Sequence, residues 1–562
     1  MSQPNRRGLL PIMLIAAVAV VISTAKLGLN GYYPQVRAAT ASYYVSPSGS
    51  DSATGSLTAP FRTVARGISQ LKPGDTLYLR TGLYREQVNI SVAGTAAARI
   101  TVKSYPNEHA VIDGTGTGVA DKNALIEILP TAQYFTLAGV GVQNSGGRGI
   151  TNRGNHIRLE GLKITNILQQ GINNRGTDGT EIVDSEVWNT ITDNAAHDGI
   201  KNWGSAVSVW ESTNTLISGN RVHDNHGEGI NSWKSTDGTK ILHNVVYDNY
   251  STDVYLEGAK NSLVEGNLIY ETETAYKPWA NVGTARELAT GLSIAQEDYT
   301  SQDPSYSCTS GGNRLINDIV RNNIIVNTRN GLNFYKYMPC NGWKNFRIEN
   351  NTIYNTWDDG IRMWAGEHSG NVFRNNIIYP RQGKALEIDT PNDTKFEANL
   401  FYASQGQTAA LFGWNGKTYS YTTWSVLPGI TQARWGDPKL GSDYRLQTGS
   451  PAIDAGTVSG AVVDFWGVTR PVQTAFDIGA HEYGGVPVTP TNTPAVSPTQ
   501  PACAMTSVGD ADCNGAVDMV DYEIFRKQYM KEAPGTSADF NRDGSIGLGD
   551  FEIWRRGFYA HI

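Results

Sequence analysis

The chain has 562 residues, of which 40% are hydrophobic, so it is too long for one ordinary domain unless that domain is a repeat, and apolar enough to bury a core. Lys and Arg number 46 against 53 Asp and Glu, which gives a net charge of −7, and the first 41 residues add four cations and no acid. Because a negative chain is repelled by phosphates, we expect no nucleic-acid partner, and a large domain with an accessory module.

The N-terminus has the pattern of a secretory signal. Arg6 and Arg7 precede an apolar run from Leu9 to Ile22 that is short for a membrane span. We expect residues 1–41 to be a signal peptide and leader, and the mature protein to be extracellular without an integral membrane span. A retained anchor is the alternative.

A repeat of about two dozen residues follows. Its marker asparagines Asn220, Asn244 and Asn267 are 24 and 23 residues apart, and after an insertion the pattern resumes at intervals of 28, 25 and 23 residues at Asn323, Asn351, Asn376 and Asn399. Each unit holds three short runs with apolar alternation, separated by Gly, Asn and Asp, which is typical of strands. Stacked as coils of a parallel β-helix, every strand gains two neighbours, and each Asn can bond its copy in the next coil. A leucine-rich repeat is the competing fold, but its Leu spacing and helices are absent.

Sequences at both ends of the repeat carry a family resemblance. The entry YYVSPSGSDSATGSLTAPFRTVARGI and the closing SPAIDAG and DIGAHEY resemble the right-handed, pectate-lyase-like β-helix proteins over roughly Tyr43–Tyr483. The resemblance implies a mainly β, right-handed parallel β-helix, which we place at residues 42–484. It specifies the reaction poorly, because such helices occur in lyases, hydrolases, epimerases and adhesins.

One strand of each coil can be aligned, from GINNR at Gly171 to ALEIDT at Ala385. Alternation predicts that Val207, Ile230, Val254, Leu292, Leu332, Ile361 and Leu386 face the core. One outward column then contains Asn173, Ser208, Asn231, Tyr255, Ser293, Asn333, Arg362 and Glu387. The other contains Arg175, Trp210, Trp233, Glu257, Ala295, Tyr335, Trp364 and Asp389.

Half of the second column is aromatic, and the coils stand about 4.8 Å apart, near the size of a sugar. We therefore predict a sugar-binding track of Trp210, Trp233, Tyr335 and Trp364, with Tyr255 and Arg362 beside it. The structural alternative is aromatic stacking that shields the sheet.

The aromatic track is interrupted at Glu257 and Ala295, which leaves room for a reacting sugar. Long insertions flank this gap, and insertions in repeat proteins gather at the functional edge. The four cysteines suit an oxidising location, and Cys308 with Cys340 and Cys503 with Cys513 are natural pairs among three possible connectivities.

Two chemistries fit the residues near the gap. For β-elimination on a uronic acid polymer, Lys234 is the candidate base, with Ca²⁺ held by Glu228, Asp253 and Glu257. For hydrolysis, two carboxylates about 5 to 9.5 Å apart are needed, and the candidates are Glu257 with Glu211 or Asp253. A Lys234–Glu257 surface salt bridge is the structural alternative. The sequence thus predicts a polysaccharide lyase or glycoside hydrolase; a non-catalytic glycan-binding or surface structural protein and a uronate epimerase are the other readings.

The C-terminal tail has its own organisation. Residues 485–504 are rich in Pro and Thr and predict an extended linker. Residues 505–562 contain two calcium-type loops, each followed by a helical segment. The expected ligands are Asp510, Asp512, Asn514, the Ala516 carbonyl, Asp518 and Asp521, and then Asp539, Asn541, Asp543, the Ser545 carbonyl and Asp550.

Asp at position 12 and the 29-residue spacing of the loops resemble a type I-like dockerin. The resemblance implies a small α-helical domain folded by two Ca²⁺ ions that binds a cohesin on a scaffold or cell surface, as in a cellulosome-like complex. Gly547 at position 9 departs from the pattern, as do the partner-reading pairs Met519–Val520 and Leu548–Gly549.

Overall fold

The computed structural model describes residues 40–195, 204–272, 288–301, 304–310 and 312–486, and single residues at 511, 524, 525, 528, 538 and 540. Most of the predicted signal and linker, Cys503, Cys513 and every predicted dockerin ligand lie outside these residues. Those ligands, Asp510, Asp512, Asn514, Ala516, Asp518, Asp521, Asp539, Asn541, Asp543, Ser545 and Asp550, stay predictions.

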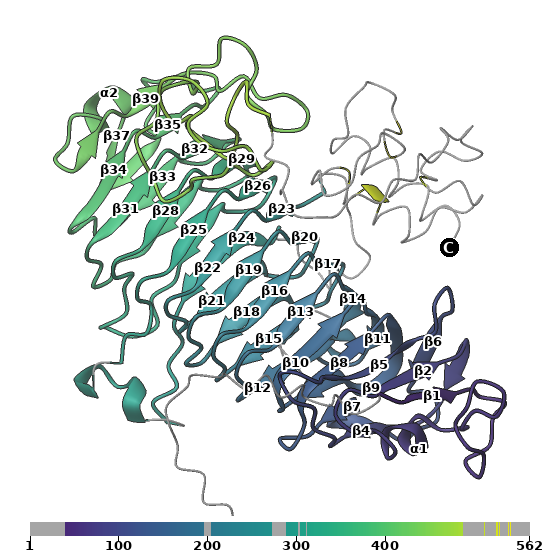
Figure 1. Ribbon diagram of the computed structural model, residues 1–562. Helices are drawn as coiled ribbons and strands as arrows, with labels where there is room; N and C mark the ends of the chain where they lie inside the picture. The colour runs from purple at the N-terminus through teal and green to yellow at the C-terminus, as the bar shows by residue number, and fades with distance from the viewer. Residues whose placement is uncertain are drawn as a thin grey trace, which may run out of the picture. The chain divides into compact units, whose positions relative to one another are not determined.

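The predicted parallel β-helix is confirmed. Short strands stack coil upon coil into three parallel sheets (Figure 1). The first sheet contains, within the described residues, β1 (Ser42–Val45), β2 (Thr76–Leu79), β5 (Ile100–Ser104), β8 (Gln133–Ala138), β10 (Asn155–Glu160), β13 (Glu181–Val183), β16 (Leu216–Ser218), β19 (Lys240–Leu242), β22 (Leu263–Glu265), β25 (Ile319–Arg321), β28 (Arg347–Glu349), β31 (Asn371–Arg374), β34 (Thr394–Glu397) and β38 (Ile430–Thr431).

The second sheet contains β3 (Gly82–Tyr84), β6 (Ala110–Asp113), β9 (Val140–Asn152), β11 (Lys163–Ile167), β14 (Glu186–Thr190), β17 (Arg221–His223), β20 (Val245–Tyr247), β23 (Leu268–Tyr270), β26 (Ile324–Val326), β29 (Thr352–Thr356), β32 (Ile377–Pro380), β35 (Leu400–Phe401) and β39 (Arg434–Trp435). The third sheet shares the long strand β9 and contains β4 (Val88–Ile90), β7 (Ala120–Ile128), β12 (Ile172–Arg175), β15 (Ser205–Trp210), β18 (Glu228–Trp233), β21 (Thr252–Glu257), β24 (Thr290–Ala295), β27 (Leu332–Phe334), β30 (Ile361–Met363), β33 (Leu386–Ile388), β36 (Phe412–Trp414) and the antiparallel β37 (Lys417–Tyr419).

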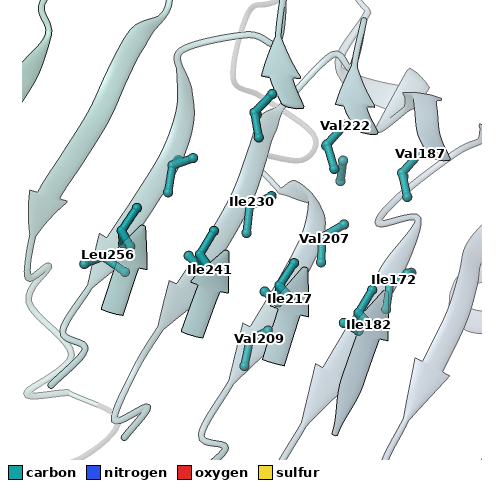
Figure 2. Packing of buried hydrophobic residues seen from close by; sticks show 14 of the residues in the cluster. Ile172, Ile182, Val187, Val207, Val209, Ile217, Val222, Ile230, Ile241 and Leu256 are labelled. Carbon is teal, nitrogen blue, oxygen red and sulfur yellow. The ribbon is translucent and has the colours of Figure 1, made fainter. Parts of the chain in front are cut away.

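The core is the interior of the coil. All seven residues predicted to face inward from the third sheet are fully buried. Figure 2 shows Val207 and Ile230 in the interior with Ile217 and Ile241 of the first sheet and Val222 of the second. Each buried Val, Leu or Ile contributes about 2 kcal/mol relative to exposure, so the stacked interior is the main source of stability.

The marker asparagines form a ladder at one corner, as predicted. Asn220 donates its backbone N–H and its side-chain amide to Asn244 Oδ1 at 2.9 and 3.0 Å, and Asn244 makes the same two bonds to Asn267. The pattern continues through Asn323, Asn351 and Asn376 to Asn399. These bonds satisfy polar groups that are buried at the turn between the first and second sheets.

Both ends of the coil are covered. Helix α1 (Val64–Ile68) buries Val64 and Ile68 at the N-terminal end, and its first N–H groups are capped by Thr63 and Glu86. At the other end, α2 (Tyr421–Trp424) inserts Trp424 into the core. The segment after β39 packs Phe465 and Trp466 against outward residues of the second sheet.

The remaining helical turns are η1 (Thr192–Asn194), η2 (Pro304–Tyr306) and η3 (Cys308–Ser310). In the part of the chain that the structure describes, no helix has the length and apolar character needed to cross a membrane.

Candidate active site

A cavity of about 430 Å³ lies over the middle of the third sheet. The strands β15, β18, β21 and β24 form its floor, and the loops that follow β24 and β27 contribute further walls. Its described lining residues are Gln170, Gly204, Ser205, Ser208, Glu228, Asn231, Trp233, Ser251, Thr252, Tyr255, Glu257, Ser293, Glu297, Tyr299, Tyr335 and Tyr337.

The strand register predicted for this sheet is confirmed. Trp210 pairs with Trp233, Trp233 with Glu257, and Glu257 with Ala295, while Asn231 pairs with Tyr255 in the neighbouring column. Five of the predicted site residues therefore line one cavity: Trp233, Tyr255, Glu257, Tyr335 and the expected calcium ligand Glu228. The gap in the aromatic column does coincide with the cavity.

Two glutamates are brought together at the cavity floor. Asn231 Nδ2 donates to Glu228 Oε2 at 2.7 Å and to Glu257 Oε2 at 3.3 Å, so these two carboxyl oxygens lie within about 6 Å of each other. Ser205 Oγ donates to the same Glu228 oxygen at 2.7 Å. Both glutamates are nearly fully buried, at 5% and 4% exposure, so the positions of their carboxyl groups are well defined by packing.

The environment of Glu257 favours its protonated form. Burial is the largest cause, followed by the negative charges of Glu297 and Glu228, and together they hold the pKa of Glu257 well above its usual range. The Tyr299 hydroxyl donates to Glu257 Oε1, and this bond together with that from Asn231 acts in the opposite, smaller direction. Burial also raises the pKa of Glu297.

Two insertion loops supply the outer wall of the cavity. Glu297 and Tyr299 follow β24, and Tyr335 and Tyr337 follow β27. The predicted disulfide between Cys308 and Cys340 is confirmed and links these loops, with the two Cα atoms 5.4 Å apart. Burial raises the pKa of Tyr337 to about 12, and that of Tyr299 also lies above its usual range, so both phenols remain protonated near neutral pH.

The indoles of the track stack on each other. The Trp210 and Trp233 rings lie 4.6 Å apart at an angle of 19°. The other side of Trp210 is covered by the Arg175 guanidinium, 3.5 Å from the ring centroid. Trp210 therefore offers little free face to a sugar and is not among the lining residues, whereas Trp233, which donates from Nε1 to Ser208, is. The structural alternative, aromatic stacking, thus describes Trp210.

Lys234 and Glu211 pair with each other beside this stack. The Lys234 ammonium is 3.1 Å from Glu211 Oε1 and 5.1 Å from the Trp210 ring centroid, and Glu211 also approaches Arg175 at 3.9 Å. The alternative of a Lys234–Glu257 salt bridge is not what these contacts show: the ammonium pairs with Glu211, and Lys234 bonds Glu257 through the backbone, where its N–H donates to the Glu257 carbonyl at 2.9 Å. Neither Lys234 nor Glu211 is a lining residue of the cavity.

Asp253 does not face the cavity. Its Oδ1 accepts a hydrogen bond from Asn249 Nδ2 at 2.8 Å, and the side chain is fully buried. The equivalent position one coil earlier is Gly229, where an added Cβ would lie 2.4 Å from the Asp253 carbonyl and 2.8 Å from Val246. The Asp253 side chain turns back to the segment between β20 and β21, so the alternation along β21 does not extend to this position. The expected calcium set of Glu228, Asp253 and Glu257 is therefore not assembled, and the described residues contain no group of three His, Cys, Asp or Glu side chains that could hold a metal.

Arg362 and Trp364 lie further along the third sheet. The Arg362 guanidinium is 4.3 Å from the Trp364 ring centroid and also pairs with Asp359 at 3.3 Å. Trp364 is 44% exposed, and neither residue lines the cavity.

Sequence reasoning missed the part of the site that comes from insertions. Tyr299 and Tyr337 have no counterpart in neighbouring coils, so no repeat register could place them. Asn231 was placed in the first outward column but was not predicted to be a site residue. Its position between the candidate acids Glu228 and Glu257 was the signal that could have identified it.

Sequence profiles of two β-helix families match the chain. The family described as "Pel9A-like, right handed beta helix region" matches residues 43–268, and that described as "Right handed beta helix region" matches residues 300–422. Both matches fall on the stacked sheets of the structure.

Named relatives include pectate lyases. Pectate lyase L of Paenibacillus polymyxa is 24% identical over 413 residues, which cover 70% of this chain and 79% of that protein. Pectate lyase PEL9 of Emericella nidulans is 40% identical over 84 residues, and the match spans 20% of its length. A crystal structure of pectate lyase Pel9A aligns with 79% of this chain and 97% of its own at 14% identity and a TM-score of 0.45. The chain thus contains a pectate-lyase-like right-handed parallel β-helix region.

Proposed function

We propose that this protein cleaves glycosidic bonds of a polysaccharide in the cavity over β15, β18, β21 and β24. The observation that supports the proposal most is the pair of buried carboxyl groups, Glu228 and Glu257, which share the Asn231 amide within about 6 Å of each other. Two carboxyl groups on either side of a glycosidic bond are the usual apparatus of glycoside hydrolysis. The naming of two relatives as pectate lyases also favours polysaccharide cleavage.

Glu257 is the better candidate for the general acid. Its raised pKa keeps a proton available at a pH where an ordinary glutamate has lost it. It would transfer that proton to the glycosidic oxygen as the bond from that oxygen to the anomeric carbon breaks, with the bonding electrons going to the oxygen. Glu228 would then attack the anomeric carbon, or remove a proton from the water that does.

β-Elimination is a second candidate, and the pectate lyase relatives are the observation that favours it. It requires a base for the C5 proton and a cation to neutralise the substrate carboxylate. Lys234 is paired with Glu211 and lies outside the described lining, so it would have to be released to act as the base. Calcium in the groove remains an expectation that a chelator would test.

The discriminating experiment is incubation of the full chain with a panel of neutral and uronic polysaccharides, with and without chelator. Hydrolysis predicts new reducing ends without ultraviolet absorbance, while elimination predicts unsaturated products that absorb. Release of no fragment from any glycan would contradict cleavage and support the non-catalytic binding module.

Glu257→Gln and Glu228→Gln should abolish cleavage while preserving glycan binding. Glu181→Gln is the matched control, because Glu181 lies on β13 of the first sheet and pairs with Arg158. Equal losses in all three variants would point to a folding defect and not to chemistry.

We further propose that the protein is secreted and that residues 505–562 dock it to a cohesin. The support is the sequence alone: the apolar run after Arg7, the Pro/Thr-rich segment, and two calcium-type loops with Asp510 and Asp539 at their first positions. Calcium-dependent capture of the full chain by a cohesin, abolished by chelator, would test this. Binding that persists after Asp510→Ala combined with Asp539→Ala would contradict it.

A further inference from the structure

The spacing of the carboxyl pair limits how the glycosidic bond can be cleaved. Asn231 Nδ2 is 2.7 Å from Glu228 Oε2 and 3.3 Å from Glu257 Oε2, so these two oxygens are at most about 6 Å apart. The N–H bonds of a planar amide diverge by about 120°, and with one N–H directed at each oxygen the separation is about 5 Å. Both glutamates line the cavity and are nearly fully buried, so packing fixes this spacing.

The spacing distinguishes the two ways in which a carboxyl pair hydrolyses a glycosidic bond. In inverting hydrolysis the carboxyl groups lie about 6.5 to 9.5 Å apart, because a water molecule must fit between the base and the sugar. In retaining hydrolysis they lie about 5 to 5.5 Å apart, because one carboxylate attacks the sugar directly. The upper bound set by Asn231 lies below the inverting range and above the retaining range, so it favours direct attack.

The contacts of the two glutamates indicate which one attacks. Glu228 Oε2 accepts hydrogen bonds from Ser205 Oγ and from Asn231 Nδ2, both at 2.7 Å, and such bonds favour the ionised form of a carboxyl group. Burial and the negative charges of Glu297 and Glu228 instead hold the pKa of Glu257 well above its usual range. An ionised nucleophile and a protonated acid therefore lie side by side.

We propose that Glu228 is the nucleophile of a retaining hydrolysis and that Asn231 is the positioning residue that sets its distance from Glu257. This inference rests on the proposed function and deepens it. In the first step a Glu228 oxygen bonds to the anomeric carbon, the bond from that carbon to the glycosidic oxygen breaks, and this oxygen takes the Glu257 proton. In the second step Glu257 takes a proton from water, whose oxygen bonds to the anomeric carbon while the ester bond breaks and its electrons return to Glu228.

The configuration of the product tests this two-step course. A glycan that the full chain cleaves is followed by proton NMR in the first minutes, before the new reducing end mutarotates. Two displacements at one carbon should release the anomer with the configuration of the cleaved bond, and added methanol should be captured as the methyl glycoside of that configuration. Release of the opposite anomer, or of unsaturated products, would overturn the inference and leave the proposed cleavage standing. Release of no fragment from any glycan would overturn both.

The ester intermediate can be located on the chain. The probe is the 2,4-dinitrophenyl 2-deoxy-2-fluoro glycoside of the sugar found at the new reducing end, because the fluorine slows hydrolysis of the ester. Mass spectrometry of the intact chain and of its peptides should show one fluorosugar on Glu228. Glu181→Gln should be labelled like the wild-type chain, whereas Glu228→Gln should not. Label on another residue, or no label on the wild-type chain, would overturn the assignment of Glu228.

The role of Asn231 is tested by the pH profile. Asn231→Ala removes a hydrogen bond that lowers the pKa of Glu257 and releases Glu228 from its donor, so kcat should fall about tenfold or more and the descending limb of the pH–kcat profile should move to higher pH. Asn173→Ala is the matched control, because Asn173 is as buried as Asn231 and has the same place in the strand two coils earlier; it should change neither. An unshifted limb in Asn231→Ala, or a shift to lower pH, would contradict the positioning role.

Discussion

Two rows of polar or aromatic residues run along the same coil and differ in their composition. At the corner between the first and second sheets, successive coils from Asn220 to Asn399 each place an asparagine, and each one bonds the next. In the outward column of the third sheet, neighbouring coils place Trp210, Trp233, Glu257 and Ala295. The uniform row satisfies buried backbone and side-chain groups, whereas the irregular row forms a cavity. In a solenoid, departure from the repeat is thus the better guide to chemistry.

The largest effect should come from Glu257 in the irregular row. Glu257→Gln keeps the shape and removes the transferable proton, so kcat should fall about hundredfold or more, with little change in thermal stability. Release of reducing ends and thermal unfolding would be measured together. Full activity in this variant would contradict the assignment of Glu257 as the general acid.

A substitution in the asparagine row should lower stability and leave the chemistry intact. Asn267→Ala leaves the Asn244 N–H and the Ile241 carbonyl without their partner and should lower the free energy of unfolding by about 3 kcal/mol. Activity at low temperature should persist. Asn392→Ala, at an exposed turn before β34, is the control; comparable destabilisation there would show that the ladder has no special role.

Loss of the Cys308–Cys340 link should affect binding more than chemistry. For a separation of 32 residues the link removes about 4 kcal/mol of chain entropy. Without it, part of that entropy would be lost only when the substrate binds and orders the loops. Cys308→Ser combined with Cys340→Ser should raise KM about tenfold and change kcat less. A decrease in kcat with no change in KM would contradict the proposal that these loops act by forming the wall of the binding cavity.

Tyr299→Phe tests the pH dependence. As the general acid, Glu257 is active when protonated, so activity falls as pH rises through its raised pKa. The Tyr299 hydrogen bond lowers that pKa, and its removal should move the descending limb of the pH–kcat profile to higher pH. A shift to lower pH would have the wrong sign.

The smallest effect should come from Trp210→Ala. Both faces of Trp210 are occupied, by Trp233 and Arg175, and the residue lies outside the cavity lining, so kcat/KM should fall less than about threefold. Trp233→Ala should cost more, because Trp233 lines the cavity. A larger loss of kcat/KM in Trp210→Ala than in Trp233→Ala would support Trp210 as part of the sugar-binding track.

The sequence predicted the repeated positions of the site better than the positions that depart from the repeat. The repeat placed Val254 inside and Glu257 outside correctly because stacked strands share one register. It failed for Asp253, whose side chain turns back to Asn249, and it left open whether the indoles on adjacent coils bind sugar or stack on each other. Tyr299 and Tyr337 could not be predicted as site residues, because they lie in insertions that cannot be aligned with neighbouring coils. The pairing of Cys308 with Cys340 succeeded because those insertions share one edge.

The asparagine contact between Asn267 and Asn323 has a consequence for how such a protein changes over evolution. Its bonds match those of the other coils although 56 residues separate the two side chains, more than twice the usual interval. The scaffold thus tolerates excursions of very different length without losing its alignment. New recognition loops can be exchanged or grafted at this level of the solenoid while the framework that carries them is inherited unchanged.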